Sequence, residues 1–173
     1  ALVPKAELDK LVAGLEQHPH VCVMSDEIYG RMTYDNQSHA SLMPYESIRD
    51  RLILLDGASK TYAMTGWRLG FAAGPVELVR AMARLQAQSS INPSSVSQAA
   101  AVAALNGPQD IVRERCAEFQ ARRDAIVPRI AAIPGLACTP PHGAFYLYVS
   151  CAGWLGKRTP QGQVLATDAD VTT

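Results

Sequence analysis

Residues 51–70, RLILLDGASKTYAMTGWRLG, contain a predicted strand and two basic residues that follow it. Near their start lies an uninterrupted apolar run, residues 52–55, which ends at Asp56. A short continuous apolar run bounded by turn residues indicates a strand that is buried on both faces, as in a parallel sheet. Lys60 and Arg68 follow this run. The stretch that defines the strand therefore also carries two cations just beyond the end of the strand.

The chain on either side of this stretch alternates between strand and helix patterns. Residues 21–24 form a second apolar run, which ends at Ser25 and Asp26, and residues 68–75 contain a third short strand. Apolar residues at helical spacing predict helices in four further segments: 4–18, 75–88, 95–107 and 109–133. This alternation of strands and helices predicts an α/β fold.

The last of these helices leads into a second unit. Residues 109–133 read as one long amphipathic helix, in which Pro128 is expected to cause a kink or an interruption because it lacks an amide hydrogen. After Gly135 the composition changes, and the aromatic run at residues 145–149 predicts a strand. The chain therefore divides into residues 1–108, the connecting helix 109–133 and residues 134–173.

The composition argues against several classes of function. Sixteen basic and sixteen acidic residues balance, so we expect neither nucleic acid nor an anionic membrane as a partner. We see no apolar run long enough to cross a membrane and no signal-peptide pattern, and we expect a cytoplasmic protein. The four cysteines and four histidines lack the spacing of metal ligands, so no metal site is expected.

Four side chains of complementary chemistry are expected at one edge of the sheet. Ligands of an open α/β sheet bind beyond the carboxyl ends of its strands, where Asp26 and Lys60 lie if their strands are parallel. Tyr29 lies three residues after Asp26, and Arg68 could return to the same edge. Pyridoxal phosphate requires such a set: an amine for its aldehyde, a carboxylate beside the ring nitrogen, a phenol for the ring oxygen and a guanidinium for the phosphate.

Each of these residues also has a purely structural explanation. Lys60 could be a solvated surface charge, and Asp26 could cap the N-terminus of a helix. Tyr29 could be a core tyrosine with one hydrogen bond, and Arg68 could belong to a surface ion pair. The spacing by itself leaves these readings open beside the cofactor site.

Two motifs resemble a known family. GASKTYAMTGWRLG (57–70) resembles the cofactor-lysine motif of the class I aminotransferases, which are fold-type I pyridoxal phosphate enzymes, and SDEIYGRMTYD (25–35) resembles the Asp-x-x-Tyr segment that precedes it. Residues 88–110 and 143–153 resemble the bacterial aspartate aminotransferases in particular. The resemblance covers essentially the whole chain. It implies part of a three-layer α/β/α large domain with a mostly parallel sheet, followed by the start of a small α+β C-terminal domain.

The resemblance also implies roles for single residues. Lys60 would form a Schiff base with pyridoxal phosphate and then move a proton between the substrate α-carbon and the cofactor. Asp26 would pair with the ring nitrogen, Tyr29 would bond the ring 3′-oxygen, and Arg68 would bind the phosphate.

The match to the family pattern is less exact at three further positions. Ser59 would add a phosphate contact, although many family members carry a phosphate-binding serine where this chain has Gly57. Asn92 falls where the family reaches into the active site of a partner subunit, which implies a homodimer.

Members of this family are considerably longer than 173 residues. We therefore expect an internal fragment, in which residues 1–108 are the later half of the large domain and residues 134–173 begin the small one. The arginine for the substrate α-carboxylate and the ring-stacking aromatic residue would lie outside it. We expect the isolated chain to be poorly stable and inactive.

The resemblance implies an aminotransferase that moves an amino group between aspartate and 2-oxoglutarate. The alternatives that keep the cofactor are prephenate, aromatic or alanine transamination, or a β-lyase reaction. A non-catalytic sensing domain and an α/β domain without a ligand are the remaining alternatives.

Overall fold

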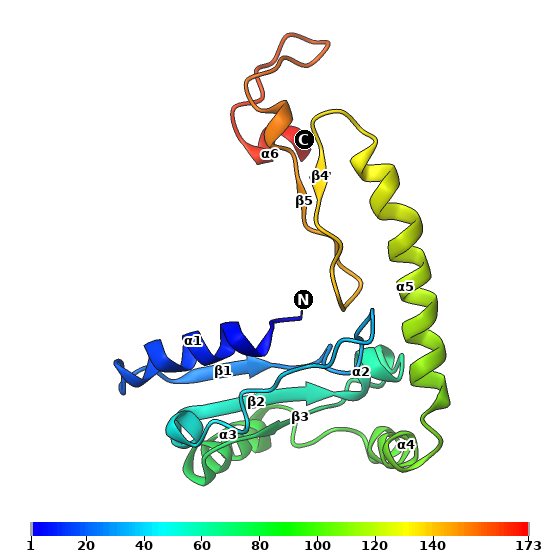
Figure 1. Ribbon diagram of the computed structural model, residues 1–173. Coiled ribbons are helices and arrows are strands. Elements are labelled where there is room, and N and C mark those ends of the chain that lie inside the picture. The colour runs from blue at the N-terminus through cyan, green and yellow to red at the C-terminus, as the bar shows by residue number, and fades with distance from the viewer. Residues whose placement is uncertain (1, 173) are drawn as a thin grey trace.

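The computed structural model describes residues 2–172 and is built around a three-stranded sheet (Figure 1). The strands are β1 (Val23–Asp26), β2 (Leu52–Gly57) and β3 (Gly70–Ala73), in the order β1-β2-β3. β1 and β2 are parallel, with Asp26 opposite Leu55. This confirms that the first two apolar runs form parallel strands whose carboxyl ends meet at one edge of the sheet.

The third predicted strand is also present and runs in the opposite direction. β3 is antiparallel to β2, with Gly57 opposite Gly70, so these three strands form a mixed sheet. The reason lies in residues 58–69, which form two short helices, α2 (Ala58–Thr61) and η2 (Thr65–Trp67). A parallel return needs a crossover over the sheet face, whereas these helices turn the chain back at the edge.

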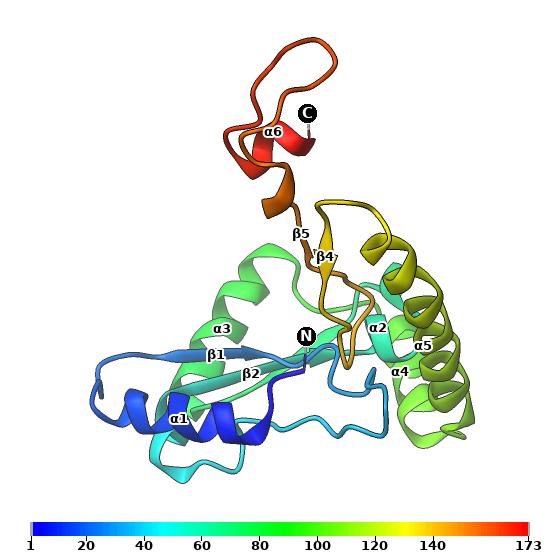
Figure 2. The same cartoon turned by 45° about the horizontal axis from the view of Figure 1, so that its top comes forward.

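The four predicted helices are confirmed, and two of them cover opposite faces of the sheet. They are α1 (Lys5–Glu16), α3 (Val76–Ser89), α4 (Ser95–Asn106) and α5 (Asp110–Ala131). α1 lies on one face and α3 on the other (Figures 1 and 2). The resulting order of helix, sheet and helix is the layering expected of an α/β domain.

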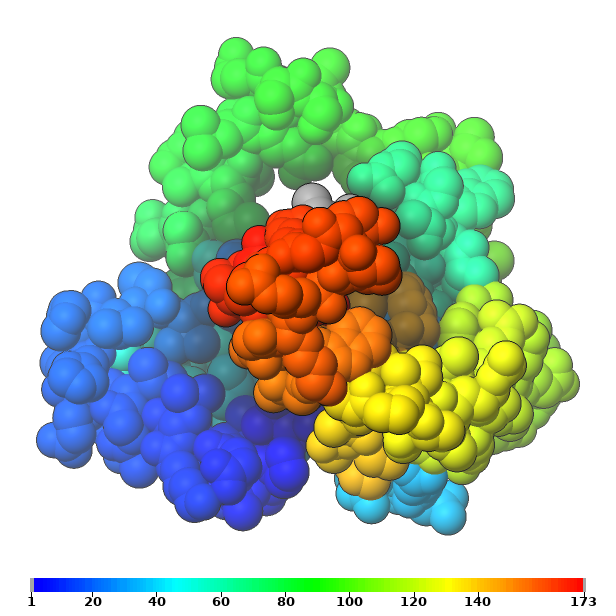
Figure 3. Space-filling view, turned by 90° about the horizontal axis from the view of Figure 1, so that it is seen from above, coloured from blue at the N-terminus to red at the C-terminus, as the bar shows by residue number. Residues whose placement is uncertain are grey.

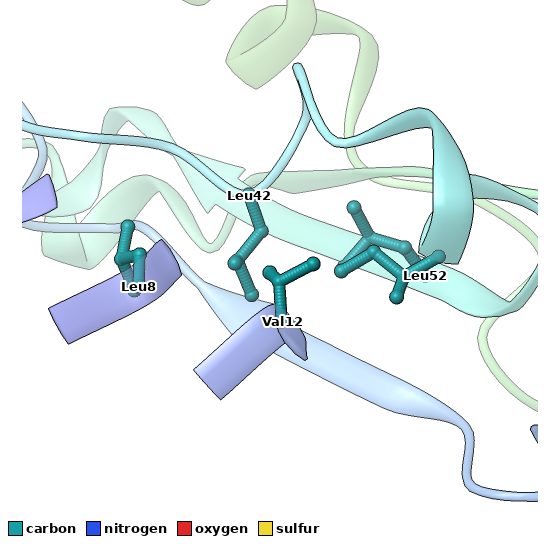
Figure 4. Packing of buried hydrophobic residues seen from close by; sticks show 5 residues of the cluster. Leu8, Val12, Leu42 and Leu52 are labelled. Carbon is teal, nitrogen blue, oxygen red and sulfur yellow. The ribbon is translucent and has the colours of Figure 1, made fainter. Parts of the chain in front are cut away.

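The hydrophobic core lies on the α1 face. Leu8 and Val12 of α1 pack with Ile48 of the short helix η1 (Glu46–Arg51) and with Leu52 at the start of β2 (Figure 4). Leu42 completes the cluster, and Ile48 is fully buried. Burying each such side chain stabilises the fold by about 1.5–3 kcal/mol. This packing fixes β2, and hence the residues that follow it, relative to β1.

α5 extends away from the sheet toward the C-terminal unit (Figure 1). It begins at Asp110 and continues past Pro128 to Ala131, so the proline does not interrupt the helix, and a kink at Pro128 stays a prediction. Pro128 lies in the last turn of the helix. Its missing N–H therefore removes one backbone hydrogen bond near the end of the helix, where few helical residues follow. α5 therefore forms one continuous connection between the sheet and the residues after it.

The chain then returns toward the sheet in a long hairpin (Figure 1). Its stem pairs β4 (Ala137–Cys138) with β5 (Val149–Ser150). The expected strand over residues 145–149 is wrong, because only its last residue is in β5. Ala144 has a left-handed backbone with φ 59°, which turns the aromatic run out of the ladder.

Two short helices, η3 (Ala152–Trp154) and α6 (Asp168–Thr172), belong to the last part of the chain. Figure 3 shows this part in orange and red, beside an open space that the α3–α4 segment, in green, borders. Among the described helices, none has the length and apolar character needed to cross a membrane.

A buried arginine of α5 forms an ion pair with the loop that follows β1. Arg123 is 8% exposed, and its Nη1 and Nη2 donate to the two carboxylate oxygens of Asp35 at 2.6 and 2.8 Å. Arg123 Nη1 also donates to the carbonyl of Pro141 at 2.8 Å, and His142 Nδ1 lies 2.9 Å from Asp35 Oδ2. We call Asp35, Arg123 and His142 the arginine clamp. It joins three segments that are far apart in the sequence.

Candidate active site

A pocket of about 550 Å³ lies at the carboxyl edge of the sheet. Its lining comes from the ends of β1 and β2, from α2 and η2, and from the tip of the long hairpin. The lining residues are Asp26, Ile28, Tyr29, Leu55, Asp56, Ser59, Lys60, Thr65, Arg68 and Tyr146. The structure therefore brings Asp26, Tyr29, Ser59, Lys60 and Arg68 to one site, as the sequence predicted. A volume of this size suits a cofactor or another small molecule.

Asp26 is the last residue of β1, and its side chain is exposed at the carboxyl edge of the sheet. Its Oδ1 accepts a hydrogen bond from the backbone N–H of Ile28 at 3.2 Å, which caps the turn that follows the strand. The carboxylate thus has a local structural role in a turn, and not as the cap of a helix, since residues 27–31 are not helical. That role uses one oxygen, and the side chain still lines the pocket.

Lys60 lies in α2, the short helix that directly follows β2. Its Nζ is 5.4 Å from the centroid of the Phe145 ring and 6.0 Å from that of Tyr29. These distances lie within or at the limit of the range for attraction between a cation and an aromatic face. The amine is therefore held against two rings inside the pocket rather than extended into solvent.

Arg68 is placed by a strained backbone. It follows η2 with φ 51° and ψ 48°, a left-handed conformation that is uncommon for residues other than glycine. Its Nη1 donates to the carbonyl of Thr65 at 3.1 Å, and the Thr65 hydroxyl donates to the carbonyl of Ser59 at 3.1 Å. These bonds link Arg68 to α2. The pocket lining therefore offers a guanidinium and two hydroxyls, donors that suit a phosphate group.

Residue 57 is glycine in this chain, whereas many members of the family that residues 57–70 resemble carry a serine there. The structure gives a steric reason for the glycine. A Cβ atom at this position would lie 3.0 Å from the carbonyl oxygen of Leu69 and 3.1 Å from Cα of Gly70. It would also lie 3.2 Å from Cδ1 of Ile28. The close approach of β3 thus favours glycine, and a serine at residue 57 would be crowded.

Tyr29 joins the pocket to the distant hairpin. Its hydroxyl lies 2.8 Å from the hydroxyl of Tyr146, within hydrogen-bonding distance. Burial, and then the hydrogen bond with Tyr146, raise the pKa of Tyr29 to about 12. Tyr29 is therefore protonated at neutral pH and can donate a hydrogen bond to an acceptor in the pocket.

Several lining residues, above all Asp56 and Tyr146, were not predicted from the sequence. Asp56 ends the apolar part of β2, and the rule that located Asp26 could have located it too. Burial raises the pKa of the Asp56 carboxyl, while the N–H of Gly57, which donates to Oδ1 at 2.7 Å, acts in the opposite direction. Tyr146 has no such local signal, because only the path of the hairpin brings it to the sheet edge.

Asn92 lies apart from this pocket. It is in the turn between α3 and α4, where its N–H donates to the carbonyl of Ser90 at 2.8 Å. The preceding residue, Ile91, has a left-handed backbone with φ 63°. Within residues 2–172, the lining of the pocket does not include Asn92, and its role toward a partner subunit stays a prediction.

The fold and the pocket together define a class of protein. An amine, a carboxylate, a protonated phenol and a guanidinium with neighbouring hydroxyls line one pocket at the carboxyl edge of an α/β sheet. This donor set fits pyridoxal phosphate, because it holds a partner for each functional group of that cofactor.

The chain belongs to the family "Aminotransferase class I and II", whose model matches residues 1–166. The class I resemblance of residues 25–35 and 57–70 is thereby confirmed. Members of class I depend on pyridoxal phosphate.

The individual proteins that are similar to this chain are also aminotransferases. An aspartate aminotransferase of Rhizobium meliloti (strain 1021) is 49% identical over 168 residues, which cover 95% of this chain and 40% of that protein. An aspartate/prephenate aminotransferase of Cereibacter sphaeroides is 41% identical, over 97% of this chain and 42% of that protein. The crystal structure of the aspartate aminotransferase from Rhizobium meliloti superimposes with a TM-score of 0.93 at 46% identity, over 99% of this chain and 43% of that one. The chain thus spans about two fifths of the length of these relatives.

Proposed function

We propose that this chain forms the lysine-bearing part of a pyridoxal phosphate-dependent aminotransferase that exchanges an amino group between aspartate and 2-oxoglutarate. The observation that carries the proposal is the meeting of Lys60, Asp26, Tyr29 and Arg68 at one pocket. The names of the relatives, aspartate and aspartate/prephenate aminotransferase, support the choice of substrates.

The proposed binding roles follow from the chemistry of each side chain. Asp26 pairs with the protonated ring nitrogen, and Tyr29 donates to the ring 3′-oxygen. Arg68 binds the phosphate, and Ser59 adds a hydroxyl donor. When bound, the cofactor supplies an electron sink that stabilises negative charge at the substrate α-carbon.

Lys60 has two proposed tasks. Its Nζ would hold the cofactor by condensing with its aldehyde, with loss of water. Once released by the substrate amine, Nζ would move the proton between the substrate α-carbon and the neighbouring cofactor carbon, first as base and then as acid. The short helix α2 keeps this amine at the sheet edge throughout.

We further propose a domain assignment and a homodimer. Residues 1–108 belong to the large cofactor-binding domain, α5 falls within the connecting helix 109–133, and residues 134–173 belong to the small domain. Asn92 projects toward the active site of a second subunit. The layered helices of the first part and the continuous α5 support this assignment.

Replacing Lys60 tests the proposal in the full-length protein that contains this chain. In Lys60→Ala we expect loss of the absorbance of the lysine-bound cofactor and a fall in transaminase turnover of at least about 10³-fold, since an activated nucleophile and a general base are lost together. Lys10→Ala is the control, because Lys10 is exposed and pairs with Glu7 of the same helix. Retention of the lysine-bound absorbance in Lys60→Ala would contradict the cofactor assignment.

A panel of amino donors separates the alternative activities. Aspartate should be the best donor. A clear preference for an aromatic donor, for alanine or for transfer to prephenate would replace the substrate assignment while leaving the class of enzyme intact. Binding of the cofactor without any turnover would favour the sensing domain instead.

A further inference from the structure

Tyr146 reaches the proposed cofactor pocket from the far end of α5. It is at the tip of the long hairpin, yet it lines the same pocket as Lys60 and Arg68. Its hydroxyl is 2.8 Å from that of Tyr29, and the two rings meet edge to face with centroids 5.6 Å apart. Tyr146 thus touches the phenol that faces the cofactor in the proposed function.

The hairpin tip is held firmly next to Tyr146. The N–H of Ala144 donates to the carbonyl of Met32 at 2.9 Å, and the buried hydroxyl of Tyr34 donates to the carbonyl of Ala144. Gly143 forms a bridge with Thr33. A Cβ atom on Gly143 would lie 2.7 Å from the carbonyl oxygen of Met32, so this approach requires glycine. The position of Tyr146 is therefore set by backbone contacts with the loop after β1.

On the basis of the proposed function, we propose that Tyr146 is a positioning residue for Tyr29. The Tyr146 hydroxyl donates to the oxygen of Tyr29, so that the proton of Tyr29 is directed at the 3′-oxygen of the cofactor. Each hydroxyl has one proton and two acceptor lone pairs. Once Tyr29 gives its proton to a pocket acceptor, the 2.8 Å contact is satisfied only with Tyr146 as donor.

This chain of two phenols has a measurable electrostatic consequence. A donor to the 3′-oxygen stabilises that oxygen most when the nearby nitrogen that joins Lys60 to the cofactor is deprotonated, since the oxygen is then the more basic. The donor therefore lowers the pKa of that nitrogen. Hydrogen bonds in a chain polarise one another and strengthen by about 10–30% per bond. Loss of Tyr146 should weaken donation by Tyr29 and raise the pKa of the nitrogen.

The test is a pH titration of the absorbance of the bound cofactor in the full-length protein. Tyr29→Phe should raise the midpoint by about 1–2 pH units, the scale of a hydrogen bond to a charged group. Tyr146→Phe should raise it by about a tenth to a third as much. In Tyr29→Phe, the added Tyr146→Phe change should have no further effect, because Tyr146 acts through Tyr29.

Tyr148→Phe is the matched control, because Tyr148 lies two residues further on and is 94% exposed. Its midpoint should equal that of the unsubstituted protein. Tyr146 is itself 58% exposed, so removal of its hydroxyl should leave the fold intact, which circular dichroism will verify.

Two outcomes would overturn the inference. One is an unchanged midpoint in Tyr146→Phe. The other is an equal shift with and without the Tyr29 hydroxyl, which would mean that Tyr146 acts independently of Tyr29. Both outcomes differ from failure of the proposed function, in which the lysine-bound absorbance would persist in Lys60→Ala.

Discussion

Arg68 combines a strained backbone with a side chain that lines the pocket. Its left-handed backbone, φ 51°, carries an energetic cost, and such strain is common at functional sites. We predict that Arg68→Ala lowers the affinity for pyridoxal phosphate by about 10–100-fold, the scale of a lost charge-assisted hydrogen bond. The affinity for pyridoxal, which lacks the phosphate, should hardly change. Absorbance titrations with both compounds measure the difference.

Arg80→Ala is the control for Arg68, because Arg80 is exposed and pairs with Glu77 of its own helix. An equal loss of affinity for pyridoxal and for its phosphate in Arg68→Ala would contradict the phosphate role.

The site residues fall into two groups according to how they could be predicted. Asp26 and Lys60 follow buried strands, and the rule for the carboxyl ends of parallel strands places such residues at one edge. Tyr146 and Phe145 reach the same edge only through α5 and the hairpin. Their placement depends on tertiary contacts that no local sequence pattern records.

At the scale of elements, the arginine clamp holds α5 and the hairpin to the loop after β1. Hydrogen bonds from Arg123 and then from His142 hold the pKa of the Asp35 carboxyl well below its usual range. We predict that Asp35→Asn lowers the Tm of the full-length protein that contains this chain by several degrees at neutral pH, since the buried Arg123 loses one charged partner and keeps Asp124. Gln120→Ala is the control, because Gln120 is neutral: its Nε2 donates to Asp35 Oδ1 at 3.3 Å, and its Oε1 accepts from the backbone N–H of Asp35 at 3.2 Å. Its Tm should fall less.

The pH dependence of this effect has a definite sign. Asp35 has a lower pKa in the folded state than in the unfolded state, so its contribution to stability is full at pH values well above the unfolded pKa of about 3.9. The contribution is lost as the pH falls from about 5 toward the lower folded pKa. The Tm difference between the parent and Asp35→Asn should therefore shrink on acidification. A difference that stays constant between pH 7 and pH 3 would contradict this role of the ion pair.

The elements themselves differ in how far the sequence determines them. The apolar periodicities of α1 and α5 are long enough to identify these helices. The direction of β3 depends on how residues 58–69 turn, and the aromatic run at 145–149 favours a strand by composition alone. The left-handed Ala144 and the contacts of its neighbours override that local preference.

At the scale of the whole molecule, the surface is too large for a compact domain. The chain exposes 11547 Å², whereas a compact monomer of 18.6 kDa exposes about 8,200 Å². All residues of α3 are described and none of them is buried, and Leu85 is 74% exposed. Ile91 in the following turn is 70% exposed, and Val96 and Val102 of α4 are 65% and 59% exposed. This apolar surface requires cover from other protein.

We therefore predict that the 173-residue chain alone is not a stable monomer. It should bind a hydrophobic dye, associate as its concentration rises and unfold without one sharp transition, because its exposed apolar surface stabilises neither the monomer nor a single packed state. Analytical ultracentrifugation and calorimetry measure these properties. Replacing Leu85 and Val96 by glutamine should reduce the association, whereas Ala83→Gln, a change to the small α3 residue Ala83, should not. A monodisperse monomer with a cooperative calorimetric transition would show instead that the α1-face core is sufficient for folding.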